Sequence, residues 1–284
     1  MARNLLRADL EIMVFARDKE SIKPVLDAGA HWVDSPALLA SSSDYIFTML
    51  GNPSDVEEVY LGGNGLLKNS RPNTVLCDMT TSSPELAKKI YDACSVKIQI
   101  LDAPVTGGVA GAKSGQLTFM VGGAESTLRQ VTPFLETMGS KIIHMGNAGA
   151  GQTAKSCNQI AVAGILLGAV EALNHAQKNA LNIDRMLEIL NSGTAASPLL
   201  KSLNQRLKEV GHAPSFSISH FVKDLKIAAA DAARAGYTIS TVDFCLHYVE
   251  ALEQSNNGEK GLQILLDPDK NQRNRLPNSL LSGR

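Results

Sequence analysis

The segment from Gly149 to Ala172 constrains the fold most strongly, because its middle part is entirely apolar. No polar side chain occurs between Ile160 and Val170. A helix that is apolar all round is normally buried in a protein core or in a membrane. The apolar run is too short for a bilayer, which needs about 20 residues. We therefore expect a buried core helix, and the lysine near its start, Lys155, needs an explanation.

The chain before this segment alternates between short apolar runs and helical patterns. Amphipathic helices are predicted at residues 83–94 and 124–139. Six mostly apolar runs are typical of strands: 11–16, 44–50, 74–79, 97–103, 117–123 and 141–146. Strands that alternate with helices predict a parallel sheet covered on both faces.

Strand patterns stop after Gly151, and helical spacing continues to the C-terminal region. Four segments carry it, with Gly or Ser near their ends: 183–193, 197–211, 219–236 and 240–255. The sequence therefore predicts an α/β domain over residues 1–147 and an all-helical domain over residues 148–284. The apolar helix that contains Lys155 joins the two.

Composition excludes several classes of function. The 284 residues carry a formal net charge of −1 and no extended basic block, so binding to nucleic acid or to a membrane surface has no electrostatic support. The four cysteines are scattered and form no CxxC or metal-like pattern, which predicts free thiols in a reducing compartment and no metal site. The N-terminus has no apolar signal-peptide core, so a cytoplasmic location is predicted.

Lys155 and Asn158 are three residues apart and share one face of the predicted helix, flanked by Gln152 and Gln159. Domain junctions are common places for ligand clefts. Apolar surroundings and a helix N-terminus disfavour the charged form of a lysine, which suits a proton donor that works near neutral pH. The alternative is a lysine that only marks the solvent end of a buried helix.

Residues 102–123 form a glycine-rich segment that starts at the end of a predicted strand. Its glycines leave backbone N–H groups open to a small anion, and the Thr106 hydroxyl adds a donor. In open α/β sheets, ligands bind outside the carboxyl ends of the strands. The alternative is a glycine-rich turn before a hairpin-like pair of strands.

Five motifs, in order and at the right separations, resemble the 3-hydroxyisobutyrate dehydrogenase family, also called the β-hydroxyacid dehydrogenases. They are MLGNPSDVEEVYLGGNGLL (49–67), DMTTSSPE (78–85), DAPVTGG (102–108), GAGQTAKSCN (149–158) and VKDLKIA (222–228). The resemblance extends from residue 1 to about residue 266. It implies a Rossmann-like doubly wound sheet followed by an all-helical domain, and an oxidoreductase that uses NAD or NADP.

The resemblance also implies roles for individual residues. Lys155 would exchange the proton of the substrate hydroxyl during hydride transfer, and Asn158 would orient the substrate. Thr106, where the family usually has Ser, would hold the substrate carboxylate together with Gly107 and Gly108. The implied cofactor-binding residues are Arg17, Leu50, Gly51, Asp55, Thr81, Lys223 and Asp224. Gly51 stands where the family commonly has Pro, and Asp55 where some members have Asn.

The sequence departs from the pattern of this class at its start. A nucleotide-binding domain needs a first strand and a G-x-G-x-x-G turn that admits the pyrophosphate. Residues 1–6 match the helix after that turn, and the glycine clusters at 62–65 and 146–151 lack the spacing. We therefore expect a truncated form that binds dinucleotide weakly. The residue that follows the strand 11–16 decides between the two cofactors, because an acidic side chain there binds the ribose 2′-OH of NAD. Arg17 at this position could face the 2′-phosphate of NADP and favours NADP. If the strand ended one residue later, Asp18 would take this position and favour NAD.

The expected function is the interconversion of a short β-hydroxy acid and its semialdehyde, with 3-hydroxyisobutyrate from valine degradation as the nominal substrate. Reduction of glyoxylate or succinic semialdehyde is an alternative. A different class is a non-catalytic truncated subunit. The expected partners are the small-molecule substrate and other copies of the chain in a homo-oligomer, with no nucleic acid and no membrane. A mitochondrial location is the alternative if a transit peptide preceded residue 1.

Overall fold

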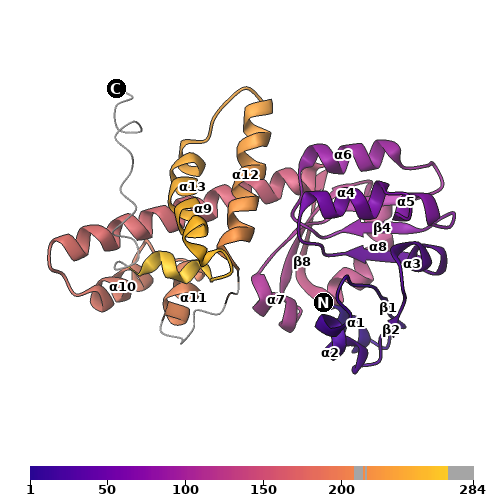
Figure 1. Cartoon of the computed structure of the whole chain (residues 1–284), viewed down its shortest axis with the longest axis horizontal. Helices are drawn as coiled ribbons and strands as arrows, with labels where there is room; N and C mark the ends of the chain where they lie inside the picture. The colour runs from indigo at the N-terminus through magenta and orange to yellow at the C-terminus, as the bar shows by residue number, and fades with distance from the viewer. Residues whose placement is uncertain (208–213, 215, 268–284) are drawn as a thin grey trace. The chain divides into compact units, whose positions relative to one another are not determined.

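The computed structural model describes residues 1–207, 214 and 216–267, and the chain forms two compact units, Met1–Lys155 and Ser156–Arg284 (Figure 1). The predicted boundary between residues 147 and 148 lies a few residues before this division, and the domain assignment stays a prediction. Residues 208–211 of the predicted helix 197–211 lie outside the described residues.

The first unit is built on a six-stranded sheet. Five strands follow the order β3-β4-β5-β7-β6, and the sixth strand, β8, pairs with β7. These strands are β3 (Tyr45–Thr48), β4 (Val75–Asp78), β5 (Gln99–Asp102), β6 (Val105–Thr106), β7 (Leu117–Gly123) and β8 (Gly139–Gly146). Strands β3, β4 and β5 are parallel, and β8 is parallel to β7.

The predicted parallel sheet has an exception at β7, which runs antiparallel to β5 and to β6. A parallel pair needs a crossover of a dozen or more residues. Only residues 107–116 separate β6 from β7, and they include the short helix α7 (Gly108–Ser114). The connection therefore folds back as a hairpin-like pair, which was the alternative interpretation of the glycine-rich segment.

The predicted strand 11–16 is also different in the structure. Within this run, only Met13 and Val14 form a strand, β1 (Met13–Val14). Strand β1 pairs with β2 (His31–Trp32), and the two form a separate two-stranded parallel sheet. The sequence did not indicate β2, because two paired residues leave no periodic pattern.

Helices cover both faces of the six-stranded sheet (Figure 1). Alternate strand residues point to opposite faces: Val75 and Cys77 pack in one core, and Leu76 packs in the other. The helices of the first core are α1 (Ala2–Leu6) and α8 (Glu125–Met138), and those of the second are α3 (Pro36–Ser42), α4 (Pro53–Leu61), α5 (Leu66–Asn69) and α6 (Pro84–Ala93).

Three of these helices begin with a polar residue followed by proline. Ser35, Asn52 and Ser83 are the N-caps of α3, α4 and α6, and a proline occupies the next position each time. The side chain of an N-cap serine or asparagine satisfies a free helix N–H, and proline has no N–H to satisfy at the first helical position. The starts of α4 and α6 end the loops that leave the carboxyl ends of β3 and β4.

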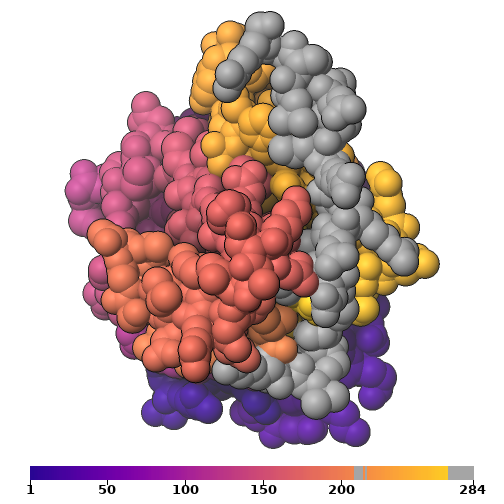
Figure 2. All heavy atoms as spheres, turned by 90° about the vertical axis from the view of Figure 1, so that its left-hand side faces the viewer, coloured from indigo at the N-terminus to yellow at the C-terminus, as the bar shows by residue number. Residues whose placement is uncertain are grey.

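The second unit is entirely helical and has its own core. Its elements are α9 (Ala150–Lys178, which begins in the first unit), α10 (Ile183–Ser192), α11 (Pro198–Leu207), α12 (Ile218–Arg234), α13 (Ser240–Leu252) and the 3-10 turn η3 (Leu262–Leu266). Helices α10 and α11 form much of the face seen in Figure 2.

Helix α9 has 29 residues, and by length and composition alone it could cross a membrane. Its apolar residues Leu166, Val170 and Leu173 are nevertheless buried in the core of the second unit, together with residues of α12 and α13. A core helix passes the same test, and this packing is what the sequence predicted for the segment.

Candidate active site

The carboxyl ends of β3, β4 and β5 carry buried polar residues in register. Thr48 pairs with Asp78, and Asp78 pairs with Asp102 on the next strand. The Thr48 hydroxyl donates to Asp78 Oδ1 at 2.8 Å, and the N–H of Thr80 donates to the same oxygen at 3.0 Å. Burial and the nearby Asp78 carboxyl raise the pKa of Tyr60, whose hydroxyl lies 2.9 Å from Thr48 Oγ1. This network holds the start of the loop after β4.

Gln152 joins that loop to the first turn of α9. Its Oε1 accepts from the N–H of Ser82 at 2.9 Å, and its Nε2 donates to the carbonyl oxygen of Thr80 at 2.8 Å. Thr81, a predicted cofactor residue, lies between these two contacts. The N–H of Leu50, another predicted residue, donates to Thr80 Oγ1 at 2.8 Å. The loops after β3 and β4 are therefore tied to each other and to α9.

Asp102 caps the N-terminus of α9 from the end of β5. Its carboxylate accepts from the N–H of Gly149 at 2.7 Å and from the N–H of Gln152 at 2.8 Å. A negative charge at this position also interacts favourably with the helix dipole. Gly122 and Gly151 allow the close approach: a Cβ on Gly122 would lie 2.5 Å from Asp102 Oδ1, and one on Gly151 would lie 2.5 Å from the Asp102 carbonyl oxygen.

One conclusion from the sequence, that the glycine cluster at 146–151 lacks the spacing of a dinucleotide-binding turn, needs a correction. Followed through to Ala154, the glycines from Gly149 onward do have G-x-G-x-x-A spacing, which dinucleotide-binding turns also show. Here, however, the Asp102 carboxylate occupies the helix N-terminus that would otherwise receive a phosphate. The glycines of this turn serve close packing and the cap.

Lys155 follows Gln152 by three residues on α9 and is buried, with 8% of its surface exposed. The cap and the Gln152 contacts fix the backbone of the turn that precedes it. The point from which the Lys155 side chain extends is therefore fixed, and burial limits the space in which its ammonium group can move; both suit a proton-transfer residue. The catalytic role of Lys155 remains a prediction.

The Asp102 cap should make stability depend on pH. Burial raises the pKa of the Asp102 carboxyl to about 6, although the two backbone N–H groups lower it. Because the folded chain binds this proton more tightly than the unfolded chain does, the free energy of unfolding should fall as pH rises from about 4 to about 6, by about 3 kcal/mol at most. Above that range this contribution should be constant.

The measurement is urea unfolding at several pH values for the natural chain and for Asp102→Asn. The asparagine variant should be less stable throughout, since its amide cannot accept both N–H groups, and it should lose the fall between pH 4 and 6. Asp92→Asn, at an exposed carboxylate on α6, is the matched control and should keep the fall. Equal slopes in all three proteins would show that Asp102 does not titrate in this range.

Thr106 is the last residue of β6, and Gly107 and Gly108 follow it at the start of α7. The two glycines are exposed and have φ angles of 125° and 62°, which favour glycine. Gly107 also packs closely, because a Cβ there would lie 3.2 Å from Leu117 Cδ2. The predicted carboxylate-binding residues therefore form one exposed turn beside β7.

Arg17 and Asp55, both predicted to contact the cofactor, form an ion pair with two contacts. Arg17 Nη1 lies 2.9 Å from Asp55 Oδ1, and Nη2 lies 3.3 Å from Oδ2. Asp55 Oδ2 also accepts from the N–H of Asn52 at the start of α4. A Cβ on Gly51 would lie 3.0 Å from the same oxygen. The structure therefore brings Arg17, Gly51 and Asp55 together.

Two side chains of the second unit, those of Gln159 and Lys223, contact Asp224, which is buried. Gln159 Nε2 donates to Asp224 Oδ2 at 2.9 Å, and Lys223 Nζ lies 3.0 Å from Asp224 Oδ1. Asn158 Oδ1 is buried and has no hydrogen-bond partner among the described residues. An unsatisfied buried carbonyl oxygen is costly, and a role of Asn158 in substrate binding stays a prediction. The ion pair places the Lys223 ammonium group beside the Asp224 carboxylate, and the roles of both residues stay predictions.

Sequence reasoning missed Asp78 and Asp102. The signal for both was present, because each is an acidic residue at the last position of a strand and directly follows two buried apolar or thiol side chains. Neither matches a motif role, and their partners are distant in the chain. In the parts of the chain that the structure describes, no group of three or more His, Cys, Asp or Glu residues could hold a metal ion.

Comparisons with known proteins agree with this architecture. The family model for the NAD binding domain of 6-phosphogluconate dehydrogenase matches residues 1–146, and the model for the NAD-binding of NADP-dependent 3-hydroxyisobutyrate dehydrogenase matches residues 149–268. YkwC, an uncharacterized oxidoreductase of Bacillus subtilis, is 39% identical over 93% of this chain and 92% of its own length.

Two further relatives have more specific names. The probable 3-hydroxyisobutyrate dehydrogenase-like 1 of Arabidopsis thaliana, described as mitochondrial, is 38% identical over 94% of this chain and 80% of its own length. The solved structure of Mycobacterium tuberculosis 3-hydroxyisobutyrate dehydrogenase with L-serine has a TM-score of 0.83 and 28% identity, and the match covers 94% of this chain and 93% of that one.

A Rossmann-like unit followed by a helical unit, with both family models matched in that order, defines the class of NAD(P)-dependent oxidoreductases. The chain belongs to the 3-hydroxyisobutyrate dehydrogenase, or β-hydroxyacid dehydrogenase, family. The fold class and family expected from the sequence are thereby confirmed.

Proposed function

We propose that the protein interconverts a short β-hydroxy acid and the corresponding semialdehyde, with 3-hydroxyisobutyrate as the nominal substrate. The observation that carries this proposal is the buried Lys155 on a helix turn held by Asp102 and Gln152. The solved structure of the M. tuberculosis relative is described as that of the enzyme with L-serine, which is also a β-hydroxy acid. It supports the same class of substrate here.

Each proposed role follows from the chemistry of the residue. In the oxidation direction Lys155 accepts the proton of the substrate hydroxyl, and in the reduction direction it returns a proton to the carbonyl oxygen. The Thr106 hydroxyl and the backbone N–H groups of the Gly107–Gly108 turn hold the substrate carboxylate. Asn158 orients the substrate through its unpartnered oxygen. A nicotinamide cofactor held by this chain would supply the hydride acceptor in oxidation and the hydride donor in reduction.

The loops after β3 and β4 suit a dinucleotide, because they lie at the carboxyl ends of parallel strands and are fixed by Thr80, Asp78 and Gln152. Leu50, Gly51 and Thr81 would hold the nicotinamide half. Lys223, whose ammonium group lies beside Asp224, would be a further cofactor-binding residue, as the resemblance implies. The Arg17 guanidinium, which is 79% exposed and keeps further N–H donors, would contact the 2′-phosphate of NADP.

The function is tested by following NAD(P)H absorbance with 3-hydroxyisobutyrate, L-serine, glyoxylate and succinic semialdehyde. Thr106→Ala should raise KM for the acid with little change in kcat, because an anchoring donor binds ground and transition states alike. Thr106→Ser should restore the natural KM. An unchanged KM with a much lower kcat would place the Thr106 hydroxyl in the chemical step.

The cofactor preference is tested by Arg17→Ala. Loss of a contact to the 2′-phosphate should lower kcat/KM for NADP by about tenfold or more and leave kcat/KM for NAD within about twofold. Asp55→Asn is the matched variant: it removes the competing carboxylate and should raise the preference for NADP. Equal losses for both cofactors in Arg17→Ala would assign the arginine to the protein structure alone.

We also propose a homo-oligomer. Helix α9 has exposed small and apolar residues along one side, namely Ala161, Gly164, Ile165 and Gly168. A solvent-exposed apolar stripe of this kind supports association between copies. Light scattering coupled to gel filtration measures the mass directly, and a monomer across micromolar concentrations would contradict the proposal. A cytoplasmic location also remains a prediction, since at least one relative is described as mitochondrial.

A further inference from the structure

Strand β8 is the outermost strand on its side of the six-stranded sheet. Among the described residues it pairs only with β7, so its other edge is open. The strand has eight residues, and two of its large apolar side chains, Ile143 and Met145, are 46% and 45% exposed. Such an edge is a template for another strand, and proteins normally pair or cover it.

The backbone of β7 shows which groups of β8 face the open edge. Met120 of β7 donates its N–H to the carbonyl oxygen of Pro104, on the side of β6. Because successive residues of a strand direct their backbone groups to opposite sides, both neighbours of Met120 bond to β8. Their partners in the parallel register are Ile142 and His144, and a residue in a parallel pair bonds to the two neighbours of its partner. The N–H and C=O groups of Ser140, Ile142 and His144 therefore point to the open edge.

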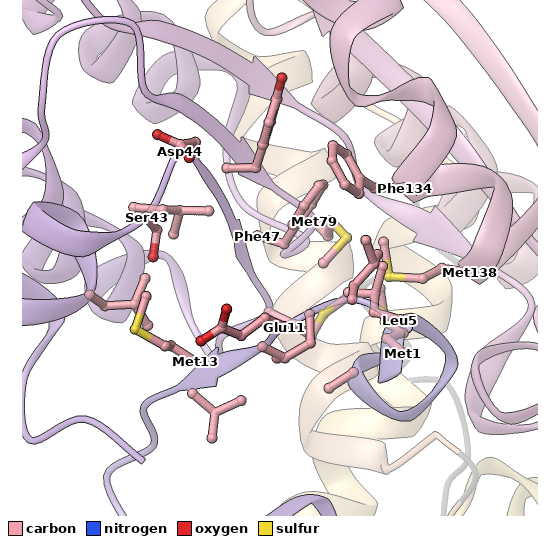
Figure 3. Close-up of a pocket in the computed structure, with 18 of the residues that line it drawn as sticks. Met1, Leu5, Glu11, Met13, Ser43, Asp44, Phe47, Met79, Phe134 and Met138 are labelled. Atoms are coloured by element: carbon pink, nitrogen blue, oxygen red, sulfur yellow. The ribbon is translucent and has the colours of Figure 1, made fainter. Parts of the chain in front are cut away.

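Helix α8 connects the parallel strands β7 and β8, so it runs in the opposite direction to β8. Phe134 and Met138 line the pocket shown in Figure 3, and this face of the helix packs in the first core. The opposite face carries charged and polar side chains. A second pocket, of about 360 Å³, lies between that face and the open edge of β8. We name it the α8–β8 groove, and its lining includes Arg129, Thr132 and Glu136 of α8 and Ser140, Ile142 and His144 of β8.

Two charges in the α8–β8 groove match each other across a two-fold axis. Arg129 and Glu136 are seven positions apart, whereas side chains that meet on one helix are three or four positions apart. In a second copy related by an axis at their midpoint, each Arg129 lies opposite the partner's Glu136. This midpoint is about 8 Å from the end of α8, and Ile142 is about 10 Å from the start of β8. Because α8 ends where β8 begins, the axis passes through Ile142.

We infer that β8 pairs in antiparallel orientation with β8 of a second copy of this chain, about a two-fold axis through Ile142. The axis places Ile142 opposite the partner's Ile142 and Ser140 opposite the partner's His144. Each of these pairs exchanges two N–H···O bonds, so all three residues with outward groups gain partners. The interface is self-complementary, as a two-fold interface must be.

The backbone of β8 and the charges of α8 select this axis independently of each other. An unrelated peptide strand would satisfy the edge of β8 but would not pair with both Arg129 and Glu136. The interface lies entirely in the first unit and does not depend on the association proposed for α9.

Charge reversal tests the pairs across the axis. Glu136→Arg places two positive charges opposite each other, so it should weaken association by about tenfold or more and halve the mass measured by sedimentation at micromolar concentrations. Adding Arg129→Glu restores opposite charges and should bring the affinity to within about threefold of the natural chain. The two positions do not meet within one helix, so this recovery requires contact between copies. Asp92→Arg, exposed on α6 at the other face of the sheet, is the matched control and should keep the natural mass.

Hydrogen exchange resolved by NMR identifies the strand that pairs. At the same protein concentration, the amides of Ser140, Ile142 and His144 should exchange about tenfold or more slowly in the natural chain than in Glu136→Arg. The alternate amides of β8 bond to β7 and should be equally protected in both proteins. An effect on every second amide is the pattern that strand pairing produces, and general stabilisation of the fold would not produce it.

Ser140→Pro tests the backbone bonds directly. Proline is tolerated on an edge strand where its N position faces away from the neighbouring strand, so the fold should remain while association weakens by about tenfold. Ser140→Ala keeps the N–H and should associate within about threefold of the natural chain. Protection of the alternate amides establishes that each variant is folded, and the charge variants carry the test if Ser140→Pro is not.

Three outcomes would overturn the inference. A natural chain whose Ser140, Ile142 and His144 amides exchange as fast as exposed amides would show that nothing pairs with β8. A combined Arg129→Glu and Glu136→Arg variant that associates as weakly as Glu136→Arg alone would show that these charges do not meet across an axis. An oligomer whose mass is the same in Glu136→Arg would place association elsewhere, and it would leave the proposed association along α9 standing.

Discussion

Lys155→Ala should lower kcat by about 10²–10⁴-fold, because a positioned general acid/base commonly contributes that much to the rate. Lys155 is buried, and it lies on a turn whose backbone is held by the Asp102 cap and by the Gln152 contacts. Removing the ammonium group leaves these supports in place. The variant should therefore stay folded and bind NAD or NADP with an affinity within a few fold of the natural chain.

Steady-state turnover and cofactor binding by calorimetry separate the two effects. Lys155→Met keeps most of the side-chain volume and should lose turnover as Lys155→Ala does, which excludes a packing explanation. Lys178→Ala, at the exposed other end of the same helix, is the matched control and should have normal turnover. Turnover within a few fold in Lys155→Ala would assign the lysine to structure only.

The order of elements in the first unit could be predicted because its strands are short apolar runs separated by helices with polar N-caps. Five of the six predicted strands lie in the main sheet. The direction of β7 could not be predicted from periodicity, since an apolar run has the same pattern in either direction. It depends on the length of the connection through α7, which was read as a glycine-rich loop.

The candidate site also has a part that the sequence predicts and a part that depends on the tertiary structure. The motifs indicated Lys155, Thr106 and Lys223 without their supports. The contacts of Asp102 with Gly149 and Gln152 span 47 and 50 residues, and those of Gln152 with the loop after β4 span about 70. No local pattern encodes such separations. They depend on the register of β4 and β5, which places the ends of the strands beside the start of α9.

Gly151→Ala should destabilise the first unit by about 1–3 kcal/mol or more and also lower turnover strongly. Local propensity predicts the opposite sign, since alanine in a helix interior is favoured over glycine by about 1 kcal/mol. Packing should win, because the new Cβ would overlap the carbonyl oxygen of Met120 and lie 2.5 Å from that of Asp102 and 2.8 Å from Asp102 Oδ2. None of these atoms can yield without moving the cap.

The displacement should reach Lys155, because it lies only four positions after Gly151 on the same helix. A misplacement of about 1 Å can lower a rate by about 10²-fold, so kcat should fall even where the variant is folded. Gly168→Ala is the matched control on α9: nothing lies within 4 Å of its added Cβ. That variant should gain up to about 1 kcal/mol and keep normal turnover. An equal gain in stability in Gly151→Ala and Gly168→Ala would show that helix propensity alone decides the effect of alanine in α9. The close approach of β5 and β7 to the first turn of α9 would then not fix the position of Lys155.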